Sequence, residues 1–238
     1  LELARLEVCL SEWLNRLTAA VHPRNRRRWT SSSTALVEQL EQRTLLSVTS
    51  VFVPETAELA VSFNHDDLQI TIEADSQTGD ILVNGESVGV SASTVQAIVV
   101  RPDPHPTSES DRPVDTGRHI DLGGVTRAAF PNLASVRIES GLGNDTVIGS
   151  QFADSIVGSL GDDHINGRGG DDTLAGDEGN DRLFGGGGRD RLDGGSGDDL
   201  LRGNAGGDLL EGGGGNDRLF GGHGRDVLLA AAGDDFVR

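Results

Sequence analysis

An aspartate recurs every nine residues from residue 140 to the end of this 238-residue chain. Two residues after each aspartate stands an aliphatic residue, from Val147 in the first unit to Val237 in the last. Glycine stands two residues before it in ten of the eleven units, Phe152 being the exception, and five residues before it in nine. The aspartates are Asp145, Asp154, Asp163, Asp172, Asp181, Asp190, Asp199, Asp208, Asp217, Asp226 and Asp235. Carboxylates at a strict spacing beside glycine-rich turns suit a metal site built from oxygen atoms.

The glycines add a second set of oxygen ligands. Glycine reaches positive φ freely, so a run such as Gly185 to Gly188 can turn the chain tightly and direct backbone carbonyls toward one point. Ca²⁺ prefers six to eight oxygen ligands, whereas Zn²⁺ would need histidine or cysteine. We therefore expect several Ca²⁺ ions. Their candidate ligands are Asp145, Asp163, Asp172, Asp181, Asp190, Asp199, Asp208, Asp217, Asp226, Asp235, Gly170, Gly179, Gly188, Gly197, Gly206, Gly215 and Gly224.

The fixed period predicts a stack of short coils, because one unit is too small to bury its own aliphatic side chain. Copies such as GGGGRDRLD and GGHGRDVLL resemble the nonapeptide of the RTX, or haemolysin-type calcium-binding, repeat family. The resemblance implies an all-β fold, a right-handed parallel β-roll over residues 140–238 in which two nonapeptides form one coil. It also implies that calcium binds between loops two nonapeptides apart and that the roll folds as it binds.

Such a roll would carry two ladders of aspartates, one on each edge. Asp145, Asp163 and every second aspartate after them would share one edge, and Asp154, Asp172 and their successors would share the other. Carboxylates about 5 Å apart repel each other by about 1 to 3 kcal/mol per pair. Six and five loops leave gaps for at most nine ions, and the end units 149–157 and 230–238 depart from the pattern. We therefore expect fewer than nine ions and a fold that depends on calcium.

Composition excludes several other classes of function. The net charge is −18, which argues against nucleic acid or an anionic membrane as the main partner. Cys9 is the sole cysteine, so no intrachain disulfide can form. No apolar run approaches the roughly 18 residues that a membrane span requires.

The first 49 residues predict a leader. Residues 1–29 combine an amphipathic helix with a basic cluster, and they are open to a second interpretation as a misplaced start. Within residues 30–49, the segment VEQLEQRTLLSV at 37–48 resembles the LEPR-XLL segment near the start of exported bacterial proteins, with Gln42 in place of its proline. This resemblance implies export, an extracellular or cell-surface location, and a secretion apparatus or a cell-surface ligand as a partner.

Residues 50–139 predict a β-rich cap on the first coil. Short alternating apolar runs begin at residues 51, 59, 68, 80, 96 and 135, and turn residues separate them. Residues 101–117 are rich in proline and polar residues, which predicts a flexible loop. The run at 135 should continue directly into the first nonapeptide.

One string in the cap could indicate an enzyme. Residues 85–89, GESVG, match the G-x-S-x-G turn of serine hydrolases, with Ser87 as nucleophile and His105 or His119 as its partner. The same residues also predict a hairpin turn at Asn84-Gly85, and the alternating helices of such hydrolases are missing from the sequence.

The pattern therefore favours a protein without catalytic residues that binds calcium as a structural or secretion-assisting module. Two alternatives remain open at this point. One is a surface adhesin that uses the roll as a scaffold and binds through outward residues such as Arg182, Arg189, Arg191 and Arg218. The other is a small hydrolase that uses Ser87.

Overall fold

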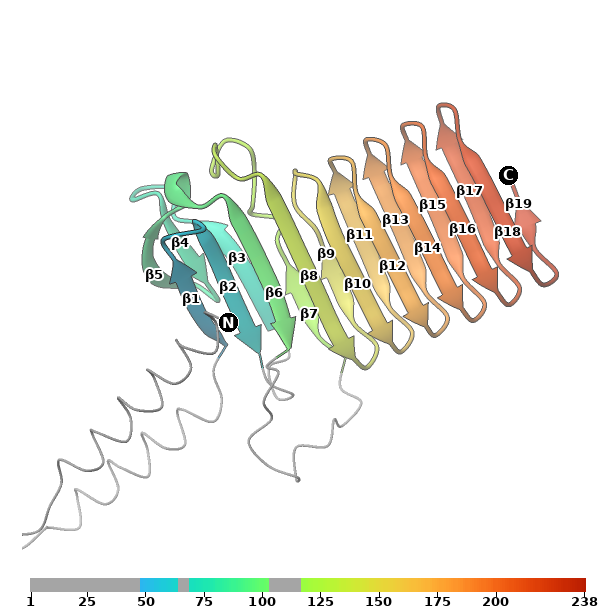
Figure 1. The fold of residues 1–238 in the computed structure, drawn as a ribbon, viewed down its shortest axis with the longest axis horizontal. Helices are drawn as coiled ribbons and strands as arrows, with labels where there is room; N and C mark the ends of the chain where they lie inside the picture. Colours follow the sequence, from blue (N-terminus) through green and yellow to red (C-terminus); the bar gives the residue numbers. More distant parts are fainter. Residues whose placement is uncertain (1–47, 64–68, 103–116) are drawn as a thin grey trace, which may run out of the picture. The chain divides into compact units, whose positions relative to one another are not determined.

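The computed structural model describes residues 48–63, 69–102 and 117–238. These residues fold into strands and one 3-10 helix, so the all-β prediction is confirmed (Figure 1). They lie in one compact unit, Leu46–Arg238. The predicted helix and basic leader at 1–29, nearly all of the segment at 30–49 and most of the loop at 101–117 lie outside the described residues. No helix in the described residues is long and apolar enough to cross a membrane.

The nonapeptides form a stack of parallel coils. Successive units alternate between two sheets, and each strand pairs with the strand two units along the chain, as in Ile165 with Leu183 and Leu174 with Leu192. One sheet contains β10 (Asp154–Leu160), β12 (Thr173–Glu178), β14 (Arg191–Ser196), β16 (Leu209–Gly214) and β18 (Val227–Ala232). The other contains β9 (Thr146–Ile148), β11 (His164–Gly169), β13 (Arg182–Gly187), β15 (Leu200–Ala205), β17 (Arg218–His223) and β19 (Phe236–Val237). The predicted coil of two nonapeptides is confirmed.

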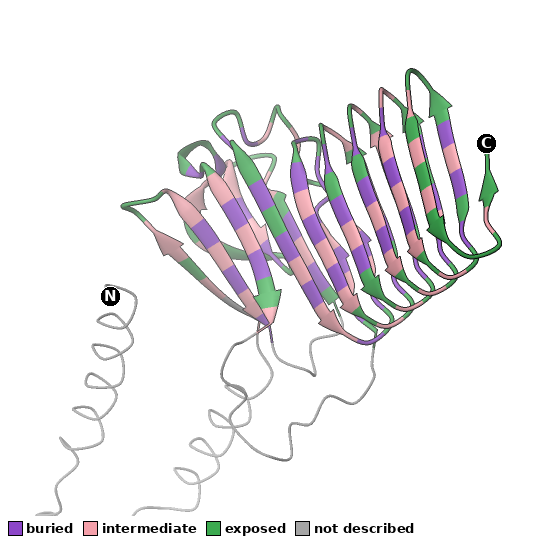
Figure 2. Ribbon diagram, turned by 45° about the vertical axis from the view of Figure 1, so that its right-hand side comes forward, coloured by how far each residue is buried: buried purple, intermediate pink, exposed green. Residues whose placement is uncertain are grey.

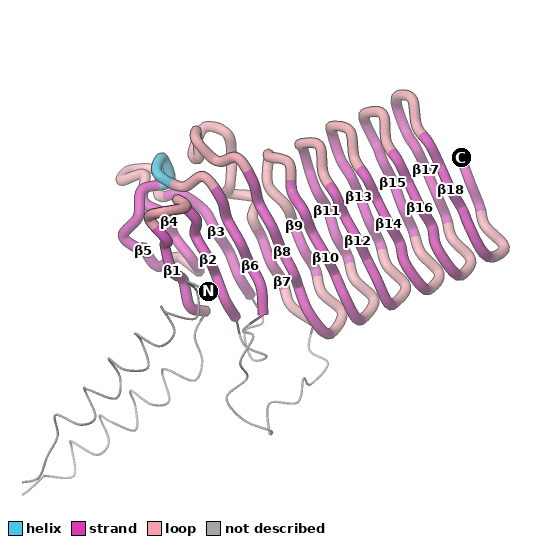
Figure 3. The backbone as a smooth tube through the Cα atoms, in the orientation of Figure 1, coloured by secondary structure: helices cyan, strands magenta, loops and turns pink. Residues whose placement is uncertain are grey.

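The strands extend into the glycine-rich part of each unit. β11 to β18 contain six residues each, and only the turn glycine, the next residue and the aspartate lie between successive strands (Figure 3). In the run Gly185 to Gly188, three glycines belong to β13 and only Gly188 lies in the turn. Parallel pairing continues through the glycines, with Gly186 opposite Arg168 and Gly187 opposite Gly169. The backbone pairing therefore extends beyond the aliphatic side chain.

A column of aliphatic side chains fills the interior between the sheets. The nine from Val147 to Leu219 are at most 1 % exposed. Buried residues alternate with outward ones along each strand, because successive side chains point to opposite faces (Figure 2). Leu228 is half-buried and Val237 is 49 % exposed, since β18 and β19 have a stacked neighbour on one side only.

The strands before the repeats extend the same two sheets. They are β1 (Thr49–Val53), β2 (Glu58–Phe63), β3 (Gln69–Ala74), β4 (Asp80–Val83), β5 (Glu86–Ser91), β6 (Ala97–Pro102), β7 (His119–Asp121) and β8 (Ser135–Leu142), with a 3-10 helix at Ala92–Thr94. β2, β6 and β8 continue one sheet in parallel, and β3 and β7 continue the other. β8 crosses the proposed boundary at residue 140, so that boundary marks a change of sequence within continuous sheets.

Candidate metal centre

Each ladder aspartate except Asp154 uses one carboxylate oxygen to join neighbouring coils. The backbone N–H of Asp163 donates to Oδ1 of Asp181 at 2.7 Å, and that of Asp172 donates to Oδ1 of Asp190 at 2.9 Å. The same bond, over 18 residues each time, links the successive aspartates of both ladders from Asp145 and Asp154 onward. The aspartates therefore lie on two edges of the roll, as the sequence predicts.

In seven of these aspartates the second carboxylate oxygen, Oδ2, is buried and has no hydrogen-bond partner, and the residues are at most 3 % exposed. The seven are Asp163, Asp172, Asp181, Asp190, Asp199, Asp208 and Asp217. A buried acceptor without a donor is destabilising, and more so if it is charged. Each Oδ2 therefore requires a cation or a proton.

Each such oxygen lies against a glycine five residues earlier. A methyl group on Gly167 would overlap Oδ2 of Asp172 and would lie 2.8 Å from the carbonyl oxygen of Gly185. A methyl group on Gly176 would overlap Oδ2 of Asp181 and would lie 2.6 Å from the carbonyl oxygen of Gly194. A carboxylate oxygen and a carbonyl oxygen of the next coil therefore border the same space beside the glycine. Two acceptors facing each other are the arrangement that a bound cation stabilises.

The glycines five residues before each aspartate are the part of this arrangement that sequence reasoning missed as site residues. Their recurrence in nine of eleven units was the available signal. The glycines that we chose, two residues before each aspartate, lie in the turns at φ between +129° and +156°. A side chain on Gly188 would overlap the carbonyl of Gly170, the equivalent glycine of the preceding coil. These turn glycines allow successive turns to stack closely.

Carboxylates alone cannot complete a metal site here. In the described residues no three His, Cys, Asp or Glu side chains form a cluster that could hold a metal ion. Backbone carbonyls would have to supply the other ligands, and such an all-oxygen set suits Ca²⁺ rather than Zn²⁺.

Burial changes the protonation of the ladder. It raises the pKa of Asp163, Asp172 and Asp199 to about 7, and that of Asp181 and Asp190 to about 6. The N–H that donates to each of these carboxylates opposes the shift, and neighbouring carboxylates add to it. Without a cation, these side chains therefore hold protons close to neutral pH.

A family model supports the same assignment. The model of the RTX calcium-binding nonapeptide repeat matches residues 139–174, 166–201 and 202–237. Residues 139–237 are RTX calcium-binding repeats. No curated protein and no solved structure matches the chain. The predicted RTX resemblance and the β-roll are confirmed, and the repeats support calcium as the ion.

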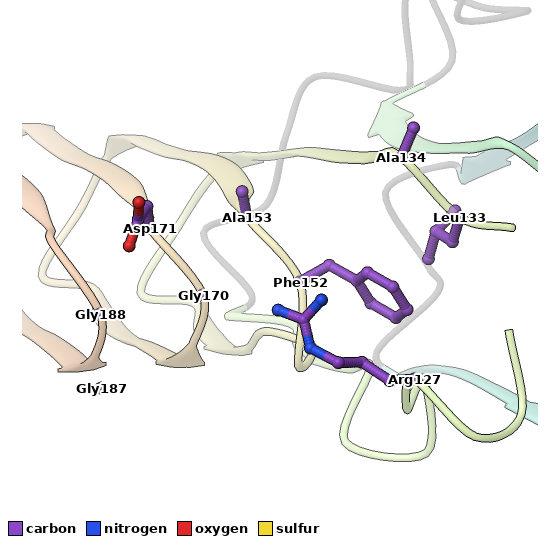
Figure 4. Close-up of a pocket in the computed structure, with 9 residues that line it drawn as sticks. All are labelled: Arg127, Leu133, Ala134, Phe152, Ala153, Gly170, Asp171, Gly187 and Gly188. Carbon is purple, nitrogen blue, oxygen red and sulfur yellow. The ribbon is translucent and has the colours of Figure 1, made fainter. Parts of the chain in front are cut away.

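Asp154, the first aspartate on its edge of the RTX roll, has a hydrogen-bond donor from the protein at each carboxylate oxygen. The backbone N–H and the hydroxyl of Ser150 bind the two oxygens of Asp154, both at 2.6 Å. Phe152, which replaces the turn glycine, is buried, and the guanidinium of Arg127 lies 5.0 Å from the centre of its ring (Figure 4). Asp154 thus differs from the other ladder residues, because both of its carboxylate oxygens already have donors.

The last two ladder residues of the RTX roll are less enclosed. Asp226 and Asp235 are half-buried, and each accepts one N–H through Oδ1, from Asp208 and Asp217 respectively. At the other end, Asp145 is buried and accepts the N–H of Arg118.

The hydrolase turn takes the alternative conformation that we considered. Asn84 and Gly85, at φ +50° and +77°, form the two-residue turn of the β4–β5 hairpin. Ser87 lies exposed on β5, and its hydroxyl accepts the N–H of Gly89 at 3.2 Å. β3 and β4 separate β5 from β7, which carries His119, and His105 lies outside the described residues. Ser87 and His119 are therefore not brought together.

Proposed function

We propose that the RTX roll binds several Ca²⁺ ions along its two edges and folds as it binds them. The observation that carries this proposal is the set of seven buried Oδ2 atoms without a donor. The proposed ligands are the ladder aspartates from Asp145 to Asp235, Asp154 excepted, and the carbonyls of the turn glycines from Gly170 to Gly224. We add the carbonyls of glycines five residues before an aspartate, such as Gly185 and Gly194, because they face Oδ2 of the preceding coil.

Bound calcium would supply two positive charges between carboxylates that otherwise repel or hold protons. The residues of the chain do the rest. The aspartate N–H and Oδ1 set the spacing of the coils, and the glycines leave room for Oδ2. Since this site forms only when two coils stack, the binding free energy of calcium becomes folding free energy.

The test is calcium titration of the full chain. We expect circular dichroism to show a gain of β-sheet signal when calcium replaces chelator, with calorimetry reporting several ions per chain. Magnesium at the same concentration is the control, because it is smaller and dehydrates reluctantly. An unchanged spectrum together with no heat of binding would show that the proposal is wrong.

We further propose that the protein is exported and works outside the cell. The support is the RTX repeat itself and the segment at 37–48 that resembles an export sequence. Extracellular calcium modules bind at about 10⁻⁴ to 10⁻³ M, and we expect an affinity in this range. Cell fractionation with and without residues 1–49 tests the location. Retention of both forms inside the cell would contradict it.

One observation favours a second function as a surface adhesin. Strands β11, β13, β15 and β17 carry no acidic residue, although the chain has a net charge of −18. Their outward arginines include Arg182, Arg202 and Arg218, none of which lies within 4.0 Å of a carboxylate of the described residues. Arg202 and Arg218 lie 5.0 and 5.9 Å from the ring centre of Phe220. This surface suits an anionic partner, since arginine binds carboxylate and sulfate groups strongly.

The other two arginines that the sequence analysis named, Arg189 and Arg191, behave differently. Arg189 pairs with Asp171 at 3.9 Å, and Arg191 pairs with Glu211. They therefore provide a matched control. With calcium present, we expect dextran sulfate to bind the chain, neutral dextran not to bind, and the triple variant R182A/R202A/R218A to lose at least about tenfold in affinity. Equal loss in R189A/R191A, or no binding at all, would remove this second function.

A further inference from the structure

We infer that Arg118 is a built-in cation that takes the place of a metal ion at the start of the Asp145 ladder. The inference rests on the proposed calcium function, because it identifies the part of the roll that folds without Ca²⁺. Arg118 lies outside the repeats and directly precedes β7.

The backbone places Arg118 on the ladder, one coil before Asp145. β7 pairs with β9 in parallel, with His119 opposite Thr146 and Ile120 opposite Val147. Arg118 therefore lies opposite Asp145. Its N–H donates to Oδ1 of Asp145 at 2.7 Å, as the N–H of Asp145 does to Oδ1 of Asp163 at the same distance. The chain thus carries an arginine where every later coil on this edge carries an aspartate.

The side chain of Arg118 binds the oxygen that later aspartates face without a donor. Its Nη1 donates to the carbonyl of Ser140 at 3.1 Å and to that of Leu142 at 2.7 Å. Ser140 stands five residues before Asp145, the place of the recurring glycine in later units. Asp172 faces the equivalent carbonyl, that of Gly185, with the acceptor Oδ2. The carbonyl of Ser140 therefore has the Arg118 guanidinium as a donor, whereas the equivalent carbonyl of Gly185 lies near a carboxylate oxygen, which is an acceptor.

The guanidinium is enclosed and lies beside a carboxylate. Arg118 is 3 % exposed, Nη1 is 3.8 Å from Oδ1 of Asp145, and the guanidinium lies 5.1 Å from the ring centre of Phe63. Gly141 lies beside it at φ +99°, and a methyl group there would lie 3.5 Å from Nη1 and 3.0 Å from Pro102. Two carbonyls and a carboxylate form the kind of oxygen set that suits Ca²⁺, and here a tethered positive charge occupies it.

We therefore expect the first coil of the roll to stay folded without calcium. Each repeat of a solenoid is stabilised by its neighbour, so folding propagates from an ordered unit. The coil formed by β7, β8 and β9 should remain folded in chelator and serve as the template on which the calcium-dependent coils assemble. Calcium-driven folding would then proceed from residue 145 toward residue 238.

Hydrogen exchange of the full chain in chelator tests this inference. We expect protection in residues 119–148 and fast exchange in residues 163–238, which calcium then protects. Arg118→Met keeps much of the length but removes the charge, and should lower protection of 119–148 in chelator by about 100-fold, because a buried carboxylate loses a neighbouring positive charge. Arg137→Met is the matched control, since Arg137 pairs with Glu139 at the surface. Equal protection of 119–148 in both variants would overturn the inference.

Arg118→Asp provides the second measurement and covers the case in which Arg118→Met fails to fold. It extends the aspartate ladder by one residue, so protection of 119–148 should become calcium-dependent and calorimetry should count one more ion than in the unaltered chain. No additional ion, or residues 119–148 left unprotected in calcium, would overturn the inference. Failure of the proposed function looks different, because the unaltered chain would then show no calcium effect on residues 163–238.

Discussion

The N–H of Asp172 donates to Oδ1 of Asp190 at 2.9 Å, while Oδ2 of both residues is buried without a hydrogen-bond partner. One oxygen of each carboxylate therefore holds the coils together whether or not metal is present. The other oxygen lowers the folding stability of the metal-free roll, because it is buried without a hydrogen-bond donor. This division between the two oxygens leads to the predictions that follow.

Replacing Asp172 with asparagine should separate folding from calcium binding. Asparagine keeps an acceptor for the N–H of Asp154 and places an NH₂ donor near the carbonyl of Gly185. A new buried hydrogen bond contributes about 1 kcal/mol, so the metal-free roll should become more stable by about that amount. Calorimetry should count fewer ions, or weaker binding, because a carboxylate ligand is lost.

The matched control for Asp172→Asn is Asp193→Asn, since Asp193 lies on β14 and points away from the interior. This variant should change neither the ion count nor the stability in chelator. Unchanged calcium binding in Asp172→Asn would show that Asp172 is not a ligand.

Acid should partly replace calcium. Burial raises the folded-state pKa of Asp163, Asp172 and Asp199 to about 7, from 3.8. The folded roll therefore binds protons more tightly than the unfolded chain, so this contribution to stability is complete below pH 3.8 and is lost as pH rises through about 7.

We therefore expect metal-free protein to show more β-sheet signal in circular dichroism at pH 5 than at pH 8. Calcium binding at pH 6.5 should release protons, which calorimetry in buffers of different ionisation enthalpy measures. A metal-free spectrum that is independent of pH between 5 and 8 would contradict the prediction.

Gly167→Ala should disrupt the roll, because the methyl group would overlap Oδ2 of Asp172. Overpacking of this kind costs about 1 to 3 kcal/mol, and calcium affinity should fall with it. Gly187→Ala is the matched control, since nothing lies within 4 Å of a methyl group there and its φ is not positive. Thermal denaturation in calcium measures both variants. Equal melting temperatures would show that the space beside Gly167 is not needed.

Ser150→Ala should destabilise the first coil without changing the number of calcium ions. It removes the hydroxyl that donates to Oδ1 of Asp154 at 2.6 Å, and a buried acceptor left without its donor costs about 1 to 3 kcal/mol. Ser155→Ala, one residue beyond Asp154 on an outward position of β10, is the control. Denaturant unfolding in calcium should show the difference, and calorimetry should show equal stoichiometry. A gain of one ion in Ser150→Ala would mean that Asp154 is a latent ligand.

Much of the repeat region follows from the amino-acid sequence alone. The regular spacing of aspartate and aliphatic residues predicted stacked coils of two nonapeptides each, because a short unit must bury its side chain against neighbours. The apolar runs that begin at residues 51, 59, 68, 80, 96 and 135 predicted six of the strands before the repeats. β5 and β7 were missed, since β5 contains Gly89 and several polar residues and β7 has only three residues.

Tertiary structure decided how the carboxylates are used. Oδ1 of Asp172 has a hydrogen-bond donor because the N–H of Asp154, one coil earlier, lies beside it. The two residues are 18 positions apart in the chain, so no local sequence pattern shows which oxygen receives the donor. The role of Gly167 likewise appears only when Oδ2 of Asp172 and the carbonyl of Gly185 are both in place. Arg118 has no motif at all, and its position opposite Asp145 arises from the pairing of β7 with β9. The sequence by itself determined the coil of two nonapeptides, because the buried aliphatic residue recurs at a fixed spacing. Only the stacking of the coils determined the metal site, because its oxygen atoms come from different coils.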